Sequence, residues 1–202
     1  TPVDFTLRMN RIRMVQSPAE VQLSEAAVRL NEETFRHYLR FLGPGRRELE
    51  AVAAASRFAE EAGAEALYWM AASGPVPRLA YLAEAWRRRH VWRRGDYHTI
   101  VLEHSAEGGY FGETTHLISL GEPKPEYSRA FAAVGEAQRA AATRICPGAW
   151  VGELADAAEA VLIERGYASL RGAGEQPAAI GHGQGGDLVV GPGGEPPAAQ
   201  RG

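Results

Sequence analysis

Side chains that can move protons or hold a substrate are concentrated in two short segments of this 202-residue chain. In the first, Glu103 is followed by the sequence Gly-Tyr-Phe-Gly-Glu-Thr-Thr-His, which supplies Tyr110, Glu113 and His116. In the second, a Gly-His-Gly-x-Gly sequence contains His182, whose flanking glycines allow close approach of another backbone. Carboxylates and imidazoles are common general acids and bases, so these residues are candidates for proton transfer and substrate binding.

A long helix is expected to precede the segments that carry these residues. The sequence Ser-Pro-Ala-Glu at 17–20 has the residues of a capping box, with proline at the first helical position. Apolar residues then recur with helical spacing until a Gly-Pro-Gly sequence at 43–45. This pattern predicts a helix over 18–41.

The remaining elements are predicted from changes in periodicity and from glycine and proline stops. Helices are expected at 46–62, 124–145 and 152–165. Strands are expected at 66–71 and in an antiparallel hairpin of 97–103 and 110–120 around a Gly-Gly turn at 108–109. Two short strands are expected at 167–170 and 178–180.

The order of these elements repeats along the chain. A helix that ends in Pro-Gly is followed by Glu-Leu, a second helix and a glycine, first over 44–63 and again over 147–166. Two helix-helix-strand units on one sheet predict an internally duplicated α+β domain with a site between its halves. We expect this domain at residues 17–182, between an N-terminal linker at 1–16 and a Gly/Pro-rich tail at 183–202.

Composition argues against several other classes of protein. Hydrophobic residues make up 45% of the chain and charged residues 23%, as in globular domains, and the formal charge of -3 provides no overall attraction to nucleic acid or an anionic membrane. A basic and aromatic run at 86–94 could contact nucleic acid, but a solvated loop explains it more simply. A single cysteine and the lack of an apolar run in the first twenty residues predict a cytoplasmic protein that binds neither nucleic acid nor membrane.

Several short sequences, taken in order, resemble the landmarks of one known family. They are Ser-Pro-Ala-Glu at 17–20, Pro-Gly-x-x-Glu at 44–48, Gly-Asp at 95–96 and Gly-His-Gly-x-Gly at 181–185. In these positions the chain is similar to the pita-bread metallopeptidases, which include methionine aminopeptidase, aminopeptidase P, prolidase and creatinase. The resemblance implies the pita-bread fold, in which duplicated helix-helix-strand units cover a curved antiparallel sheet.

The resemblance also implies a site for two divalent metal ions, and the chain departs from its ligand pattern. Glu103 and Glu113 stand where the family has two aspartates, and two further histidines of the family have no counterpart. His182 is the one ligand matched without substitution. The last two glutamate ligands would lie beyond Gly202, so either the chain is incomplete at its C-terminus or the metal site is lost. We expect no metal cofactor unless such C-terminal ligands exist.

The function implied by the resemblance is that of a hydrolase of the Xaa-Pro aminopeptidase and creatinase type. It would act on a C–N bond of a small amide or peptide-like substrate, with altered or absent metal dependence. Glu113, His116 and His182 would be catalytic, with His116 facing the central cleft, while Glu103 and Tyr110 would bind substrate. The alternative is a catalytically inactive pita-bread protein that keeps the cleft for binding or assembly. We expect a homodimer, or a partner chain that completes the cleft.

Overall fold

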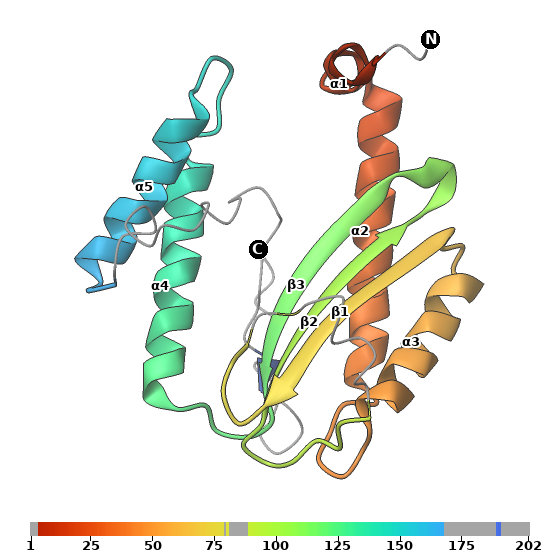
Figure 1. The fold of residues 1–202 in the computed structure, drawn as a ribbon, viewed down its shortest axis with the longest axis vertical. Helices are drawn as coiled ribbons and strands as arrows, with labels where there is room; N and C mark the ends of the chain where they lie inside the picture. The colour runs from red at the N-terminus through yellow and green to blue at the C-terminus, as the bar shows by residue number, and fades with distance from the viewer. Residues whose placement is uncertain (1–3, 79, 81–88, 168–188, 191–202) are drawn as a thin grey trace.

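A computed structural model describes residues 4–78, 80, 89–167 and 189–190 of the chain. Three long strands cross the middle of the molecule, with α2 behind them, α3 beside β1, and the α4–α5 pair at the left of the view (Figure 1). The arrangement is of the α+β class, as predicted. The elements are α1 (Thr6–Arg13), α2 (Pro18–Leu39), α3 (Glu48–Glu61), β1 (Ala66–Gly74), β2 (Tyr97–Ser105), the 3-10 helix η2 (Glu107–Gly109), β3 (Phe111–Ser119), α4 (Pro125–Ala142), α5 (Val151–Glu164) and β4 (Val189–Val190).

The N-terminus of α2 forms as its sequence predicts. Ser17 Oγ accepts a hydrogen bond from the Glu20 amide at 3.4 Å, and the Glu20 carboxylate accepts one from the Ser17 amide at 2.7 Å. These bonds satisfy two of the amides that a helix N-terminus leaves without helical partners. The helix ends at Leu39, slightly before the predicted end, because the Arg40 amide bonds to the His37 carbonyl in a tighter turn.

The strands form one sheet in the order β1-β2-β3-β4. β1 pairs with β2 and β2 with β3, both antiparallel, which confirms the predicted hairpin. The hairpin turns through η2, where Gly108 and Gly109 have φ of 82° and 71°, a conformation that favours glycine. β4 adds a parallel pairing at the end of β3, which the sequence does not predict because two residues are too few to show a periodicity.

The main core lies between the sheet and the helices α2 and α3. Gly112 of β3 lies so close to α2 that a Cβ added to it would be 2.8 Å from the backbone of Ala27 and Val28. The amide of Asn31 also donates hydrogen bonds to the carbonyl oxygens of Leu102 and Gly112. The buried core residues include Tyr38, Leu42, Val52, Trp69, Trp92, Ile100, Leu102 and Ile118.

Helices α4 and α5 pack against each other around a separate small core. Ala137, Ala141 and Ala158 are buried there, with Leu154 and Leu162 packed against them. This helix pair repeats the pair α2–α3, as the predicted duplication requires. Residues 168–170 and 178–180, where most of the later strands are expected, lie outside the described residues.

The N-terminal segment contains a helix that the sequence analysis does not predict. α1 occupies residues expected to form only a linker, and none of its residues is buried. No helix within the described ranges is long and apolar enough to cross a membrane.

Candidate functional site

Glu103 and Glu113 lie directly opposite each other on β2 and β3. Successive residues of a strand point to opposite faces of a sheet, and His98, which bonds to Tyr38 of α2, points toward the helices. Glu103 and Glu113 therefore point to the other face, called here the open face. Opposed residues have Cβ atoms about 4.5–5.5 Å apart, so both carboxylates can reach one water molecule or one substrate group.

Tyr68 extends this row of side chains onto β1. It pairs with Glu103 in the sheet register and therefore lies on the same face. Its side chain is 49% exposed, and its ring lies 5.9 Å from that of Phe111. The sequence analysis misses Tyr68 because it lies in an apolar run that is interpreted as a buried strand. Side chains alternate between the two faces of a strand, so Tyr68 and Trp69 must lie on opposite faces. This alternation is the signal that could have placed Tyr68 on the open face.

An apolar groove of about 440 Å³ begins beside the two carboxylates. Val101 and Thr115, which form the next pair along the strands, line its floor. The wall opposite the sheet belongs to α4 and includes Phe131 and Val134. Because residues two apart on a strand are about 7 Å apart, Glu103 and Glu113 lie at the mouth of this groove.

His116 does not lie with the two glutamates. It pairs with Ile100 on the face covered by α2, where its ring stacks on Phe35 with a centroid distance of 3.5 Å and an interplanar angle of 4°. The expectation that His116 faces the cleft is therefore wrong. The physical reason is that His116 lies three positions after Glu113, and an odd spacing on a strand reverses the face.

Tyr110 precedes β3 and bonds to the start of α2. Its hydroxyl donates to Glu20 at 2.8 Å, which ties the β2–β3 hairpin to the helix cap. The bond to Glu20 raises the pKa of Tyr110. The pKa of Glu20 is lowered by its hydrogen bonds, the one from the Ser17 backbone contributing most. The structure thus assigns Tyr110 a contact within the protein, while its expected contact with substrate stays a prediction. His182 lies outside the described residues, so its expected role is likewise untested.

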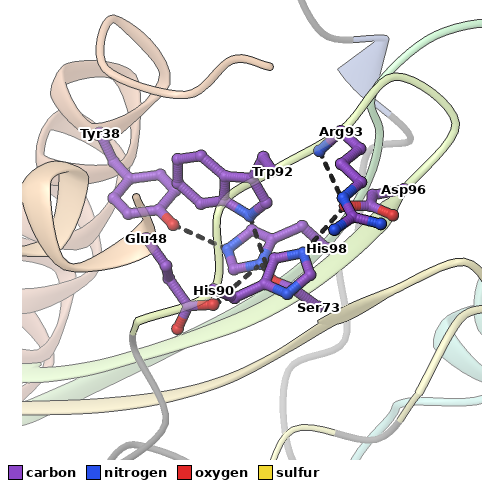
Figure 2. Close-up of polar contacts among 8 residues, drawn as sticks. All are labelled: Tyr38, Glu48, Ser73, His90, Trp92, Arg93, Asp96 and His98. Atoms are coloured by element: carbon purple, nitrogen blue, oxygen red, sulfur yellow. Dashed lines mark hydrogen bonds and ion pairs between the residues drawn. The ribbon is translucent and has the colours of Figure 1, made fainter. Parts of the chain in front are cut away.

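A buried polar network around His98 lies on the face of the sheet that is covered by α2 (Figure 2). His98 is fully buried, with Nε2 at 2.8 Å from the Tyr38 hydroxyl and Nδ1 at 2.8 Å from Ser73 Oγ. Ser73 donates to Glu48 at 2.9 Å and accepts from Trp92 Nε1 at 3.1 Å. Burial, and secondarily the nearby His90, lower the pKa of His98 to about 3, so it is neutral near pH 7.

The proton positions in this network follow from its donors. Trp92 Nε1 can only donate, and the Ser73 proton is directed to Glu48. His98 Nδ1 must therefore carry the imidazole proton and donate it to Ser73, while Nε2 accepts from Tyr38. The network joins α2, α3, β1 and β2, and no sequence motif predicts it because its members are far apart in the chain.

Two further histidines support the same region of the fold. His90 Nε2 lies 2.9 Å from the Asp96 carboxylate, which also accepts a hydrogen bond from the Arg93 amide and so closes the loop before β2 (Figure 2). His104 lies on the buried face of β2 with its ring against Trp69. Burial lowers the pKa of His104 to about 4, an effect that the Glu103 backbone partly opposes.

The described residues alone do not complete a metal site. Glu103 and Glu113 supply two carboxylates, but no group of three or more histidine, cysteine, aspartate or glutamate side chains comes together in the described part of the chain. A protein site for a transition metal ordinarily has at least three protein ligands.

Comparison with known sequences decides the family. The sequence profile of metallopeptidase family M24 matches residues 22–199, which is most of the chain. The chain belongs to metallopeptidase family M24. Its fold is accordingly the pita-bread fold that the sequence landmarks predict. This M24 chain is also 29% identical over 168 residues to the "Probable dipeptidase PepE" of Mycobacterium tuberculosis, an alignment that covers 83% of this chain and 44% of that relative.

Solved structures agree with this assignment. The dipeptidase PepE of Mycobacterium ulcerans superposes with a TM-score of 0.70 at 28% identity, over 82% of this chain and 44% of that one. The X-Pro aminopeptidase of Thermotoga maritima gives a TM-score of 0.68 at 26% identity, over 79% of this chain and 45% of that one. The M24 chain thus spans less than half the length of each of these three relatives.

Proposed function

We propose that this M24 chain forms the catalytic part of a hydrolase that cleaves a C–N bond in a peptide or peptide-like amide. The observation that carries the proposal is the pairing of Glu103 with Glu113 on the open face, at the mouth of an apolar groove. Membership of a peptidase family and likeness to a dipeptidase and an X-Pro aminopeptidase support a peptide substrate.

The chemistry assigned to the two glutamates is proton transfer and orientation of water. Glu113 accepts a proton from the attacking water as its oxygen bonds to the carbonyl carbon, and then delivers that proton to the leaving nitrogen as the C–N bond breaks. Glu103 holds the water or the substrate in position for this attack on the carbonyl carbon. His182 contacts the reacting group in this scheme. His116 has no step in it because its ring packs against Phe35 on the other face.

The proposal includes altered or absent dependence on divalent metal. Glutamates replace the aspartates that the family resemblance leads us to expect, and a longer side chain moves the carboxylate away from the sheet. It also includes assembly as a homodimer, or with a partner chain that completes the cleft.

A catalytically inactive binding protein is the second candidate. It is favoured by the position of the histidines: His98, His104 and His116, the three on the described strands, all lie on the buried face. The open face of those strands therefore offers carboxylates and Tyr68 but no imidazole. In this case the groove would bind a peptide segment without cleaving it.

Substitution of the glutamates tests the proposal. Glu113→Gln keeps the size of the side chain but removes its ability to accept a proton, and should lower peptide turnover by about 10²-fold or more. Glu103→Gln should also lower turnover, whereas Glu122→Gln, at an exposed position after β3, is the matched control and should leave it unchanged. Full activity of Glu113→Gln would contradict the proposed role, and a wild-type protein that binds peptides without cleaving them would favour the second candidate.

A further inference from the structure

We propose that the groove beside the carboxylate pair binds an extended apolar segment of an oligopeptide whose free C-terminal carboxylate meets Arg78. This inference rests on the proposed function and names the substrate class of the same site. It depends on the length of the groove, on the residues along it and on the one charge at its far end.

Thr99 and Val101 of β2 lie on the floor of the groove, and the sheet register sets the length of the open face that continues past them on both sides. From Glu103 the open face continues along β2 through Val101 and Thr99 to Tyr97. At about 3.3 Å per residue, the six steps between Glu103 and Tyr97 cover roughly 20 Å.

Helix α4 provides the other wall over a similar length. Its start is fixed to the Tyr97 end, since the Tyr97 and Tyr127 rings lie 4.9 Å apart and the Lys124 amide donates to the Tyr97 hydroxyl at 2.8 Å. Gln138 lines the groove farther along the helix. With a rise of 1.5 Å per residue, Gln138 lies about 16 Å beyond Tyr127.

Arg78 lies at the Tyr97 end of the groove. A Cβ added to Gly74, which pairs with Tyr97, would lie 3.9 Å from Arg78 Nε. Arg78 is exposed, and it is the one charged side chain among the described residues that line the groove. It forms no ion pair with any residue whose position the structure gives. An exposed guanidinium group that forms no such ion pair can bind a carboxylate through two parallel hydrogen bonds.

These dimensions distinguish a short peptide from a longer one. An extended peptide spans at most about 3.3–3.6 Å per residue, so a dipeptide placed at Glu103 reaches only about as far as Val101. About five or six residues are needed to place one peptide bond at the carboxylate pair and the terminal carboxylate at Arg78. Between these points the groove favours apolar side chains, because Val101, Leu117 and Phe131 line it.

Calorimetric binding to the 202-residue protein tests the inference. The ligands are an apolar hexapeptide with a free C-terminus and a reduced, uncleavable first peptide bond, the same peptide amidated at its C-terminus, and the dipeptide of its first two residues. We expect the free acid to bind at least about tenfold more tightly than the amide, the effect typical of a charge-assisted hydrogen bond, and the dipeptide to bind most weakly. Arg78→Gln should abolish the preference for the acid. Arg129→Gln, at an exposed position on α4 outside the groove lining, is the matched control and should keep it.

Turnover of the corresponding cleavable peptides separates this inference from the proposed function. Equal affinity of the wild-type protein for acid and amide would overturn the inference, and so would loss of the preference in Arg129→Gln. Hydrolysis without any Arg78-dependent preference would overturn the inference while the proposed function stands. Arg78-dependent binding without hydrolysis would support the assigned groove and contradict the proposed function.

Discussion

Acidification should destabilise this protein through two histidines that are buried in the neutral form. The pKa of His98 is lowered to about 3 and that of His104 to about 4, in both cases chiefly by burial. In the unfolded chain each imidazole has a pKa near 6.5. The unfolded state therefore binds more protons below pH 6.5, and the free energy of unfolding must fall as the pH falls through this range.

The magnitude at pH 5 follows from the distance of that pH below the unfolded-state pKa, because both folded-state pKa values are lower still. At pH 5 the unfolded state gains about 1.36 kcal/mol for each pH unit below 6.5, so each histidine costs about 2 kcal/mol relative to neutral pH and the two together about 4 kcal/mol. This is a large part of the 5–15 kcal/mol that stabilises a typical domain. The loss continues until the pH reaches the folded-state pKa of each group.

Urea unfolding followed by tryptophan fluorescence between pH 7 and pH 5 measures this effect. His104→Phe retains an aromatic ring against Trp69 and should remove about half of the pH dependence, because it deletes one of the two titrating groups. The reasoning is refuted if wild-type stability is constant over this range, or if His104→Phe has the same pH dependence as the wild type.

Three other predictions test the packing, the buried network and the metal dependence. Gly112→Ala should destabilise the fold by about 1–3 kcal/mol, because its Cβ would meet the α2 backbone at 2.8 Å. Gly152→Ala, whose Cβ would have nothing within 4 Å, is the control and should not destabilise it. Equal stability of the two variants in urea would contradict the observed packing. Ser73→Ala should cost about 1–3 kcal/mol by removing the hydroxyl that joins Glu48, His98 and Trp92, and an unchanged unfolding midpoint would argue against the network. Metal analysis of protein purified without chelator should find fewer than two divalent ions per chain, and two tightly bound ions would contradict altered metal dependence.

Local signals in the sequence predict most of the described fold. The capping box at Ser17 and the glycine stops locate the helices to within a few residues, because these signals act on the neighbouring backbone. In the structure, alternation along β2 places His98 and His104 on the face opposite Glu103. The family landmarks add the pita-bread arrangement, which periodicity alone does not specify.

The sequence predicts less of the site because its contacts join distant parts of the chain. The family resemblance predicts that His116 faces the cleft, although its odd spacing from Glu113 places it on the other face. The bonds of Ser73 to Glu48 and His98 each join residues that are 25 positions apart, and only the folded sheet brings them together. Tyr68 is hidden in the sequence by the apolar run around it, and only the sheet register shows that it lies beside Glu103.

The central claim is that the Glu103–Glu113 pair directs water to a peptide C–N bond, and peptide cleavage in oxygen-18 water tests it most directly. Mass spectrometry of the products should show one oxygen-18 atom in the newly formed carboxylate with the wild-type protein and with Glu122→Gln. The labelled product should be nearly absent with Glu113→Gln. Labelled product formed by Glu113→Gln at the wild-type rate, or no cleavage by the wild-type protein, would contradict the claim.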